Sequence, residues 1–155
     1  MLTVPAISLR RSKYTDPSFL HFCDALDAEF RSRYPEESFD FSPYNKIDKK
    51  ARVVLAYDGD SPVGCGCFRP DKDGSVEIKR MYVVPRQRGK QIARRILDAL
   101  EEWAMEDGFT AAKLETGIGQ PEARSLYLRS GYHEIPNYPP YCDIALSICM
   151  QKRLG

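Results

Sequence analysis

The segment from Val83 to Ala93 has the residue types of a phosphate-binding turn. A valine-rich stretch ends at Pro85, a basic turn follows, and an amphipathic stretch begins near Gly89. The start of a helix exposes amides without partners and carries partial positive charge, so it binds phosphate groups well. Gly89 allows a close approach of the main chain, and Arg88 and Lys90 add charge. The segment predicts a diphosphate site; a basic helix cap on the surface is the alternative.

Two common nucleotide-binding motifs do not fit this turn. A P-loop needs glycine where Val84 stands and a serine or threonine after Gly89-Lys90, and both are missing. The glycines of a dinucleotide-binding fingerprint are missing too. The turn therefore indicates a different kind of phosphate site.

The elements that must position this turn follow from the apolar periodicity. Aspartate-glycine turns predict that residues 52–84 form a three-stranded meander. We expect strands at 7–10, 52–57, 62–68, 76–84, 111–116 and 143–151, and helices at 17–33, 89–107 and 121–130. Residues 34–50 are expected to form a loop. The order predicts an α/β fold with a mixed, mostly antiparallel sheet flanked by helices.

Length and composition narrow the class of protein. A chain of 155 residues predicts one domain, residues 1–155, and a net charge of +1 does not call for a nucleic-acid or membrane partner. Neither a secretory signal nor a membrane-spanning run is visible. Five cysteines, an odd number at low density, fit a cytoplasmic location. Cys65 and Cys67 have no companion pair at metal-ligand spacing, so we expect core thiols and no metal.

Two segments resemble the GCN5-related N-acetyltransferase (GNAT) family. Arg86 and Gly89 match the first and fourth positions of its Q/R-x-x-G-x-G/A signature, whereas Gln91 departs from the last. The segment from Gln120 to Tyr132 resembles the family's N-x-x-A-x-x-L-Y-x-x-x-G-F pattern, with glutamine and tyrosine replacing the terminal asparagine and phenylalanine. The resemblance covers residues 52 to 135 well and implies the GNAT fold and an acetyl group transferred from acetyl-CoA to an amine.

The resemblance also implies which residues contact the cofactor. In the family, the main chain of the strand before the turn pairs with the pantetheine arm of coenzyme A, as an added strand would. Carried over to this sequence, the acetyl-CoA contacts are Met81, Tyr82, Val83, Arg88, Gly89, Lys90, Gln91, Ile92, Ala93 and Gln120. The side chain of Gln91 stands next to the pyrophosphate, where it could weaken the affinity for the cofactor.

Acyl transfer to an amine needs a base, because an alkyl ammonium cannot attack a thioester. The resemblance implies Glu77, on the strand before the turn, as that base, although a water chain or a merely ion-paired Glu77 is the alternative. It implies Tyr127 as the acid that protonates the coenzyme A sulfur, unless that ring only packs in the core. The amine would attack directly in a ternary complex.

The acceptor and the activity leave alternatives open. Family enzymes frame the acceptor with the first helix, the following loop and the last strands, where carboxylates and aromatic rings could hold a small amine. These residues are Glu29, Tyr34, Glu36, Glu37, Phe39, Asp40, Phe41, Tyr44, Tyr138 and Tyr141. Arg31 and Arg33 favour an acceptor with a carboxylate. A protein lysine or N-terminus, a non-catalytic acyl-CoA sensor, a cofactor-free partner-binding protein and a homodimer all remain possible.

Overall fold

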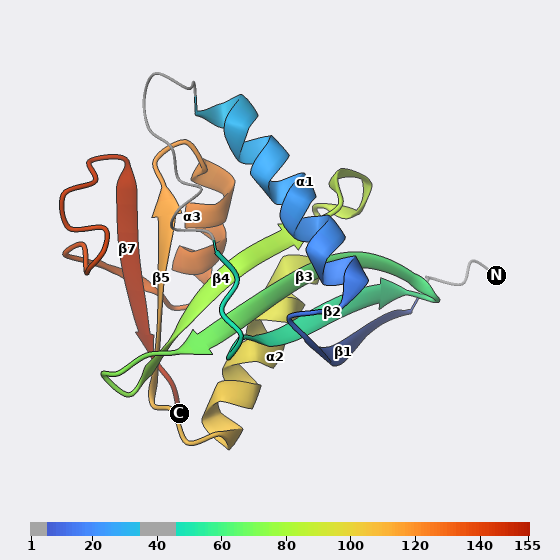
Figure 1. Ribbon diagram of the computed structural model, residues 1–155, viewed down its shortest axis with the longest axis horizontal. Coiled ribbons are helices and arrows are strands. Elements are labelled where there is room, and N and C mark those ends of the chain that lie inside the picture. Colours follow the sequence, from blue (N-terminus) through green and yellow to red (C-terminus); the bar gives the residue numbers. More distant parts are fainter. Residues whose placement is uncertain (1–5, 35–45) are drawn as a thin grey trace.

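The chain forms a mixed seven-stranded sheet within residues 6–34 and 46–155, which are the residues that the computed structural model describes. The strand order is β1-β2-β3-β4-β5-β7-β6 (Figure 1). Among the described strands, β4 and β5 are parallel neighbours and the other pairs are antiparallel. The strands are β1 (Ile7–Lys13), β2 (Arg52–Asp58), β3 (Ser61–Pro70), β4 (Ser75–Val83), β5 (Ala111–Gly117), β6 (His133–Ile135) and β7 (Ser147–Arg153).

Helices cover both faces of the sheet because successive residues of its central strands point apolar side chains to opposite faces. Val53 and Leu55 pack in one cluster with α1 (Pro17–Arg33). Their neighbours Val54 and Ala56 pack in a second cluster with α2 (Ile92–Glu106) and Tyr127 of α3 (Pro121–Arg129). Figure 1 shows α1 in front of the sheet and α2 behind it. Both faces of the central strands are therefore buried, and the loops at the strand ends are left to form a site.

The strands β4 and β5 separate halfway along their length. Their pairing ends at Ile78 and Leu114. Just beyond that point β4 has a bulge, in which Arg80 takes a φ of 59° and Cys65 pairs with Tyr82 while Cys67 pairs with Lys79. A bulge bends a strand and increases its local twist. It thus turns the second half of β4 away from β5 and opens a slot between them.

The side chain of Arg80 fixes this bulge to α1. It is almost fully buried, and it donates to Asp27 Oδ1 at 3.0 Å and to the carbonyl oxygen of Cys23 at 2.8 Å. A positive φ is costly for a residue with a side chain and persists only where its surroundings impose it. The contacts with α1 provide that constraint beside the slot.

Most of the expected elements are confirmed, and the differences have local causes. The α/β class, the meander and the order of helices agree with the expectation. The second helix begins at Ile92 rather than near Gly89, because Pro85–Gln87 form a separate 3-10 turn. The last strand begins at Ser147 rather than 143, and the short β6 was not expected. The loop expected at 34–50 lies largely outside the described residues. No helix within the described ranges is long and apolar enough to cross a membrane.

Candidate functional site

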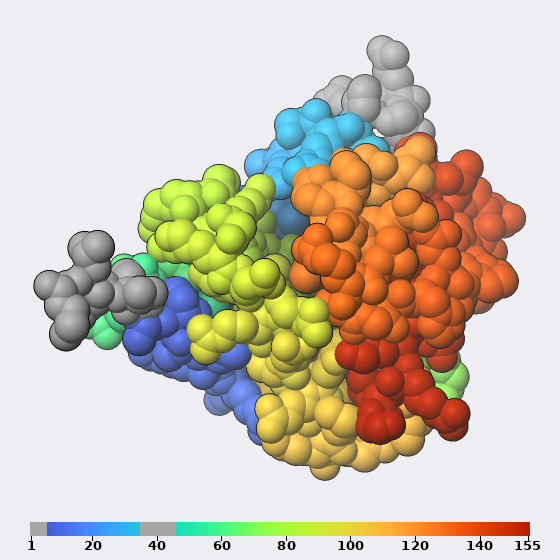
Figure 2. Space-filling view, turned by 180° about the vertical axis from the view of Figure 1, so that it is seen from behind, coloured from blue at the N-terminus to red at the C-terminus, as the bar shows by residue number. Residues whose placement is uncertain are grey.

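A cleft of about 360 Å³ opens where β4 and β5 separate. Figure 2 shows the hollow from behind, between the yellow-green start of α2 and the orange α3. Eleven of the twelve residues assigned from the sequence to catalysis or cofactor binding line it, namely Glu77, Met81, Tyr82, Val83, Arg88, Gly89, Gln91, Ile92, Ala93, Gln120 and Tyr127. The exception is Lys90, whose ammonium group contacts Gln87 at 3.0 Å. The fold therefore brings both sequence segments to one cavity.

The start of α2 provides unpaired amides at one end of the cleft. No side chain within residues 6–34 and 46–155 caps this helix, in contrast to α1, whose cap Asp16 accepts from the amide of Ser18 at 2.9 Å. The amides of Gly89, Lys90 and Gln91 have no acceptor in the described part of the chain. Open amides at a helix start are the groups that bind a phosphate. This end of the cleft can therefore bind a diphosphate.

Two residues with positive φ shape this turn. Gly89 has a φ of 82° and Gln91 a φ of 66°. Glycine adopts this left-handed region readily, whereas another residue meets a steric cost there. Gln91 therefore adopts the left-handed backbone conformation that glycine would adopt at this position of the signature, and the turn keeps its shape. Ile92 points into the core, so only its amide is available to a ligand.

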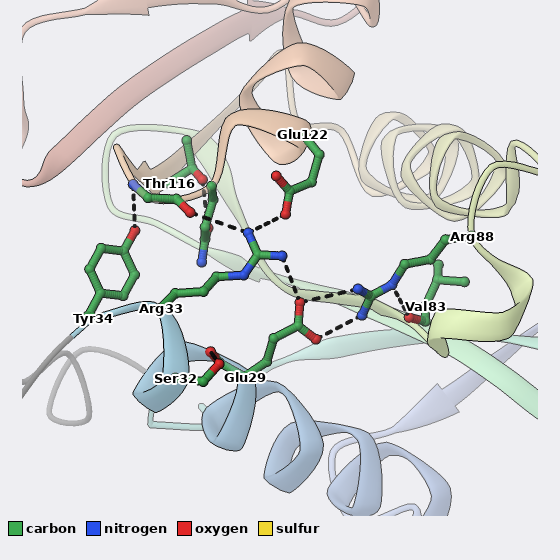
Figure 3. A network of polar contacts seen from close by, with 10 residues as sticks. Glu29, Ser32, Arg33, Tyr34, Val83, Arg88, Thr116 and Glu122 are labelled. Atoms are coloured by element: carbon green, nitrogen blue, oxygen red, sulfur yellow. Dashed lines mark hydrogen bonds and ion pairs between the residues drawn. The ribbon is translucent and has the colours of Figure 1, made fainter.

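A network of charges joins α1 to both walls of the cleft (Figure 3). The carboxylate of Glu29 accepts from Arg88 at 2.8 and 3.3 Å and from Arg33 at 3.1 Å. Arg33 also pairs with Glu122 at the start of α3 and donates to the carbonyl oxygen of Gly119 at 3.3 Å. Arg88 is therefore directed at Glu29, and any contact that it makes with a phosphate must compete with this ion pair.

Glu77, the base expected from the sequence, is held on both carboxylate oxygens. Arg69 donates to Oε1 at 2.8 Å, and the hydroxyl group of Tyr138 donates to Oε2 at 2.8 Å. The ammonium group of Lys79 lies 3.7 Å from Oε1, and only 1% of the Glu77 side chain is exposed. A base must be free to bind the proton that it removes. The catalytic role of Glu77 stays a prediction, and this geometry favours a positioning role instead.

Glu115 on β5 is a site residue that the sequence reasoning missed. It follows Leu114, the last residue of β5 that pairs with β4, so it stands where the slot begins, and it lines the cleft. Its Oε1 atom is buried and has no hydrogen-bond partner among the described residues. Burial, and then the charge of Glu77, raises the pKa of Glu115 to about 7, although Ser147 and Lys79 act in the opposite direction. A carboxylate with this pKa can accept a proton at neutral pH.

Tyr127 lines the cleft from α3. Its ring is 6% exposed and packs edge-on against Tyr132, with 5.9 Å between the ring centroids. Its hydroxyl group makes no hydrogen bond within the described ranges. Burial, and then the nearby Glu115 carboxylate, raises the pKa of Tyr127. The phenol therefore stays protonated and faces the same slot as Glu115.

The remaining assigned residues have mainly structural contacts. The hydroxyl group of Tyr34 accepts from the amide of Gly119 at 3.1 Å. A side chain on Gly117 would collide with this ring, and one on Gly119 would crowd it. Gln120 accepts from Thr116 at 2.8 Å. Cys65 and Cys67 are buried core thiols, as expected. The proposed acceptor residues Glu36, Glu37, Phe39, Asp40, Phe41 and Tyr44 lie outside the described residues.

The raised pKa of Glu115 predicts a specific dependence of stability on pH. A folded pKa of about 7 lies above the ordinary value of 4.5, so the folded protein binds more protons between these two values. Stability is therefore highest below pH 4.5 as far as this group is concerned, and it falls as the pH rises through about 7. Glu115→Gln should remove this loss and raise the free energy of unfolding by up to about 3 kcal/mol above neutral pH.

Chemical denaturation across the pH range measures this effect. The difference between Glu115→Gln and the unmodified protein should vanish near the ordinary pKa of a glutamate. The exposed Glu102 on α2 provides the matched control, since Glu102→Gln removes the same charge from the surface. A constant difference at every pH would mean that Glu115 titrates normally.

Comparisons with known proteins agree with this geometry. The model of the acetyltransferase (GNAT) family matches residues 19–132. The chain is 33% identical to an IAA acetyltransferase of Azospirillum brasilense over 97% of this chain and 100% of that protein. A solved structure of a candidate acyl-CoA N-acyltransferase from Klebsiella pneumoniae superposes with a TM-score of 0.82 at 29% identity, covering 98% of this chain and 100% of the other. The PaiA N-acetyltransferase of Thermoplasma acidophilum, solved with coenzyme A, has a TM-score of 0.70 at 14% identity, covering 94% and 99%.

Proposed function

Because the chain belongs to the acetyltransferase (GNAT) family, we propose that it transfers an acetyl group from acetyl-CoA to a primary amine of a small molecule. Enzymes of this family are acetyl-CoA-dependent acyltransferases. The observation that carries the proposal is the slot between β4 and β5, which starts at the open amides of α2 and ends at Glu115 and Tyr127. An acyl donor with an anionic diphosphate at one end and a reactive thioester at the other would match the amides at the start of the slot and the two side chains at its end.

The residues along the slot fit acetyl-CoA. The amides of Gly89 to Gln91 would donate hydrogen bonds to the oxygens of the diphosphate. Beyond Ile78, the main chain of β4 pairs with no residue of β5, so the amides and carbonyls of Met81 to Val83 could pair with the amide groups of the pantetheine arm. Acetyl-CoA would supply the activated acyl group and a thiolate leaving group. Each of these contacts uses main-chain atoms, which tolerate the sequence departures at Gln91 and Gln120.

Two side chains would move the protons of the reaction. We assign to Glu115 the removal of the ammonium proton of the acceptor, because the residue lines the cleft, its Oε1 has no hydrogen-bond partner among the described residues, and its pKa is about 7. We assign to Tyr127 the donation of a proton to the departing sulfur. Glu77, clamped by Arg69 and Tyr138, would orient the surrounding cations rather than accept a proton. The amine would attack directly, in a complex that holds both substrates.

Release of free thiol from acetyl-CoA tests this function. We expect that at least one primary amine in a panel of small molecules accelerates the release, and that coenzyme A raises the melting temperature. Acceleration by a lysine peptide alone would move the acceptor to proteins. A melting shift without acceleration by any amine would identify a sensor of acyl-CoA and overturn the proposal.

Replacing Tyr127 by phenylalanine should lower turnover about tenfold. The effect is moderate because a thiolate with a pKa near that of cysteine leaves without full protonation. The apparent Michaelis constant for acetyl-CoA should stay within about twofold, since the ring keeps its contact with Tyr132. Steady-state kinetics at saturating amine measures both constants.

The matched control for this variant is Tyr132→Phe. It removes a phenol from the same aromatic pair, but that hydroxyl group donates to Glu101 at 2.9 Å and does not line the cleft. Tyr132→Phe should reduce stability and leave turnover nearly unchanged. Equal turnover in Tyr127→Phe and the unmodified protein would exclude Tyr127 as the acid.

A further inference from the structure

A second cavity of about 270 Å³ adjoins the cleft on the side of Lys79 and Tyr141. Lys79 and Tyr141 line both cavities, and Lys79 contacts the hydroxyl group of Tyr141 at 3.3 Å. The two hollows therefore meet at this pair of side chains. A molecule that occupies both would pass Lys79 and Tyr141 on its way to the slot.

The second cavity carries an excess of positive charge. Lys46, Arg69 and Lys79 line it together with a single carboxylate, that of Asp48, and the buried carboxylate of Glu77 behind the wall balances one further charge, so that one positive charge is left in excess. One oxygen of Asp48 is already engaged, because it accepts from the amide of Lys50 at 2.7 Å. Lys46 is exposed at the cavity and has no hydrogen bond or ion pair in the described part of the chain. The charge of the walls thus favours an anion.

Arg69 presents its donor groups in a fixed orientation. Its Nε atom donates to the buried carboxylate of Glu77 at 2.8 Å, and Tyr138 holds the other oxygen of that carboxylate. The terminal nitrogens Nη1 and Nη2 have no partner among the described residues. A guanidinium group held through Nε offers two parallel donors, which match the two oxygens of a carboxylate or phosphonate.

We propose that the second cavity binds an oxyanion at the far end of the acceptor, so that the substrate is an amine carrying a carboxylate or phosphonate. The amine would reach Glu115 in the cleft while the oxyanion pairs with Arg69 and Lys46. Lys79 stands between the two positions and would repel a second ammonium group, so diamines are disfavoured. This inference rests on the proposed function, because it names the acceptor of the same site.

Binding to the protein saturated with coenzyme A tests the inference without requiring turnover. The probes are straight-chain ω-amino acids from glycine to ε-aminohexanoate, their primary amides, and the matching aminoalkylphosphonates, each titrated by calorimetry. At the best chain length, an oxyanion should bind at least about tenfold more tightly than the amide, because a charge-assisted bidentate pair is lost in the amide. The phosphonates identify which oxyanion fits best.

Variants locate the preference. Arg69→Gln should reduce the preference for the acid over the amide to about threefold or less. Arg69→Lys should retain part of this preference, because the positive charge remains while the two parallel donors of the guanidinium group are lost. Lys46→Gln, an exposed change that cannot disturb the core, should reduce the preference about threefold. The matched control Arg52→Gln removes an arginine paired with Asp107 at 3.7 Å, outside both cavities, and should have no effect.

The outcomes separate this inference from the proposed function. Equal binding of acid and amide by the unmodified protein, or a preference that survives both Arg69→Gln and Lys46→Gln, would overturn the oxyanion site. Thiol release measured in parallel with the same probes tests catalysis. A binding preference without release with any amine would leave the oxyanion site standing and remove the transferase function.

Discussion

Glu115→Gln should lower kcat/KM for the acceptor amine by about a thousandfold at neutral pH, within the usual range for loss of a general base. Glutamine keeps the size of the side chain and cannot take up a proton. The dissociation constant for acetyl-CoA should change little, because the amides that would bind the diphosphate lie at the other end of the cleft. Steady-state kinetics and cofactor binding on one preparation separate the two quantities.

The pH profile distinguishes a base from a structural residue. Because the pKa of Glu115 is about 7, the unmodified enzyme should lose activity as the pH falls through that value and the carboxylate becomes protonated. In Glu115→Gln this limb should disappear. The remaining rate should rise steadily toward alkaline pH, where the amine loses its proton without help.

Glu77→Gln is the matched comparison for this prediction. The same change of charge occurs at a carboxylate with both oxygens engaged, by Arg69 and Tyr138. We expect a loss below about tenfold and an unchanged acidic limb, since the group that titrates remains in place. The opposite result, in which Glu77→Gln removes the limb and Glu115→Gln leaves it, would restore the assignment expected from the sequence.

The sequence was sufficient for the parts of the site made from local signals. The turn around Gly89 and the helix carrying Tyr127 were predicted because glycine, proline and apolar spacing determine where strands end and helices begin. Local patterns also predicted the sheet meander, since each hairpin has its own turn residues.

What the sequence left open depends on contacts between distant segments. Glu77 and Glu115 are both glutamates on strands. Arg69 and Tyr138 hold both oxygens of Glu77, whereas Oε1 of Glu115 has no hydrogen-bond partner among the described residues. The bulge at Arg80 could not be predicted from local residue types, because no glycine marks the position with positive φ. Contacts with α1, more than 50 residues away in the chain, stabilise it instead. The available signal was the position of Glu115 directly after Leu114, the last large apolar residue of a strand that leads into the second motif.

The phosphate turn allows a second test with a large effect, using two substitutions of nearly equal shape. Gly89 has a φ of 82°, and an added Cβ atom would meet nothing within 4 Å. Asparagine and aspartate both tolerate this left-handed conformation better than other residues with a side chain. Gly89→Asn and Gly89→Asp therefore impose a similar backbone cost and differ in one negative charge.

Gly89→Asp should raise the dissociation constant for acetyl-CoA about thirtyfold to a hundredfold relative to Gly89→Asn. A carboxylate placed near a diphosphate repels it by about 2 to 3 kcal/mol in a partly solvated site. The repulsion should weaken as the salt concentration rises, since the turn is exposed and its charges are screened. Calorimetric titration at two salt concentrations measures both effects. If aspartate and asparagine at position 89 bind the cofactor equally well, the diphosphate lies elsewhere, and the amides at the start of α2 have another role.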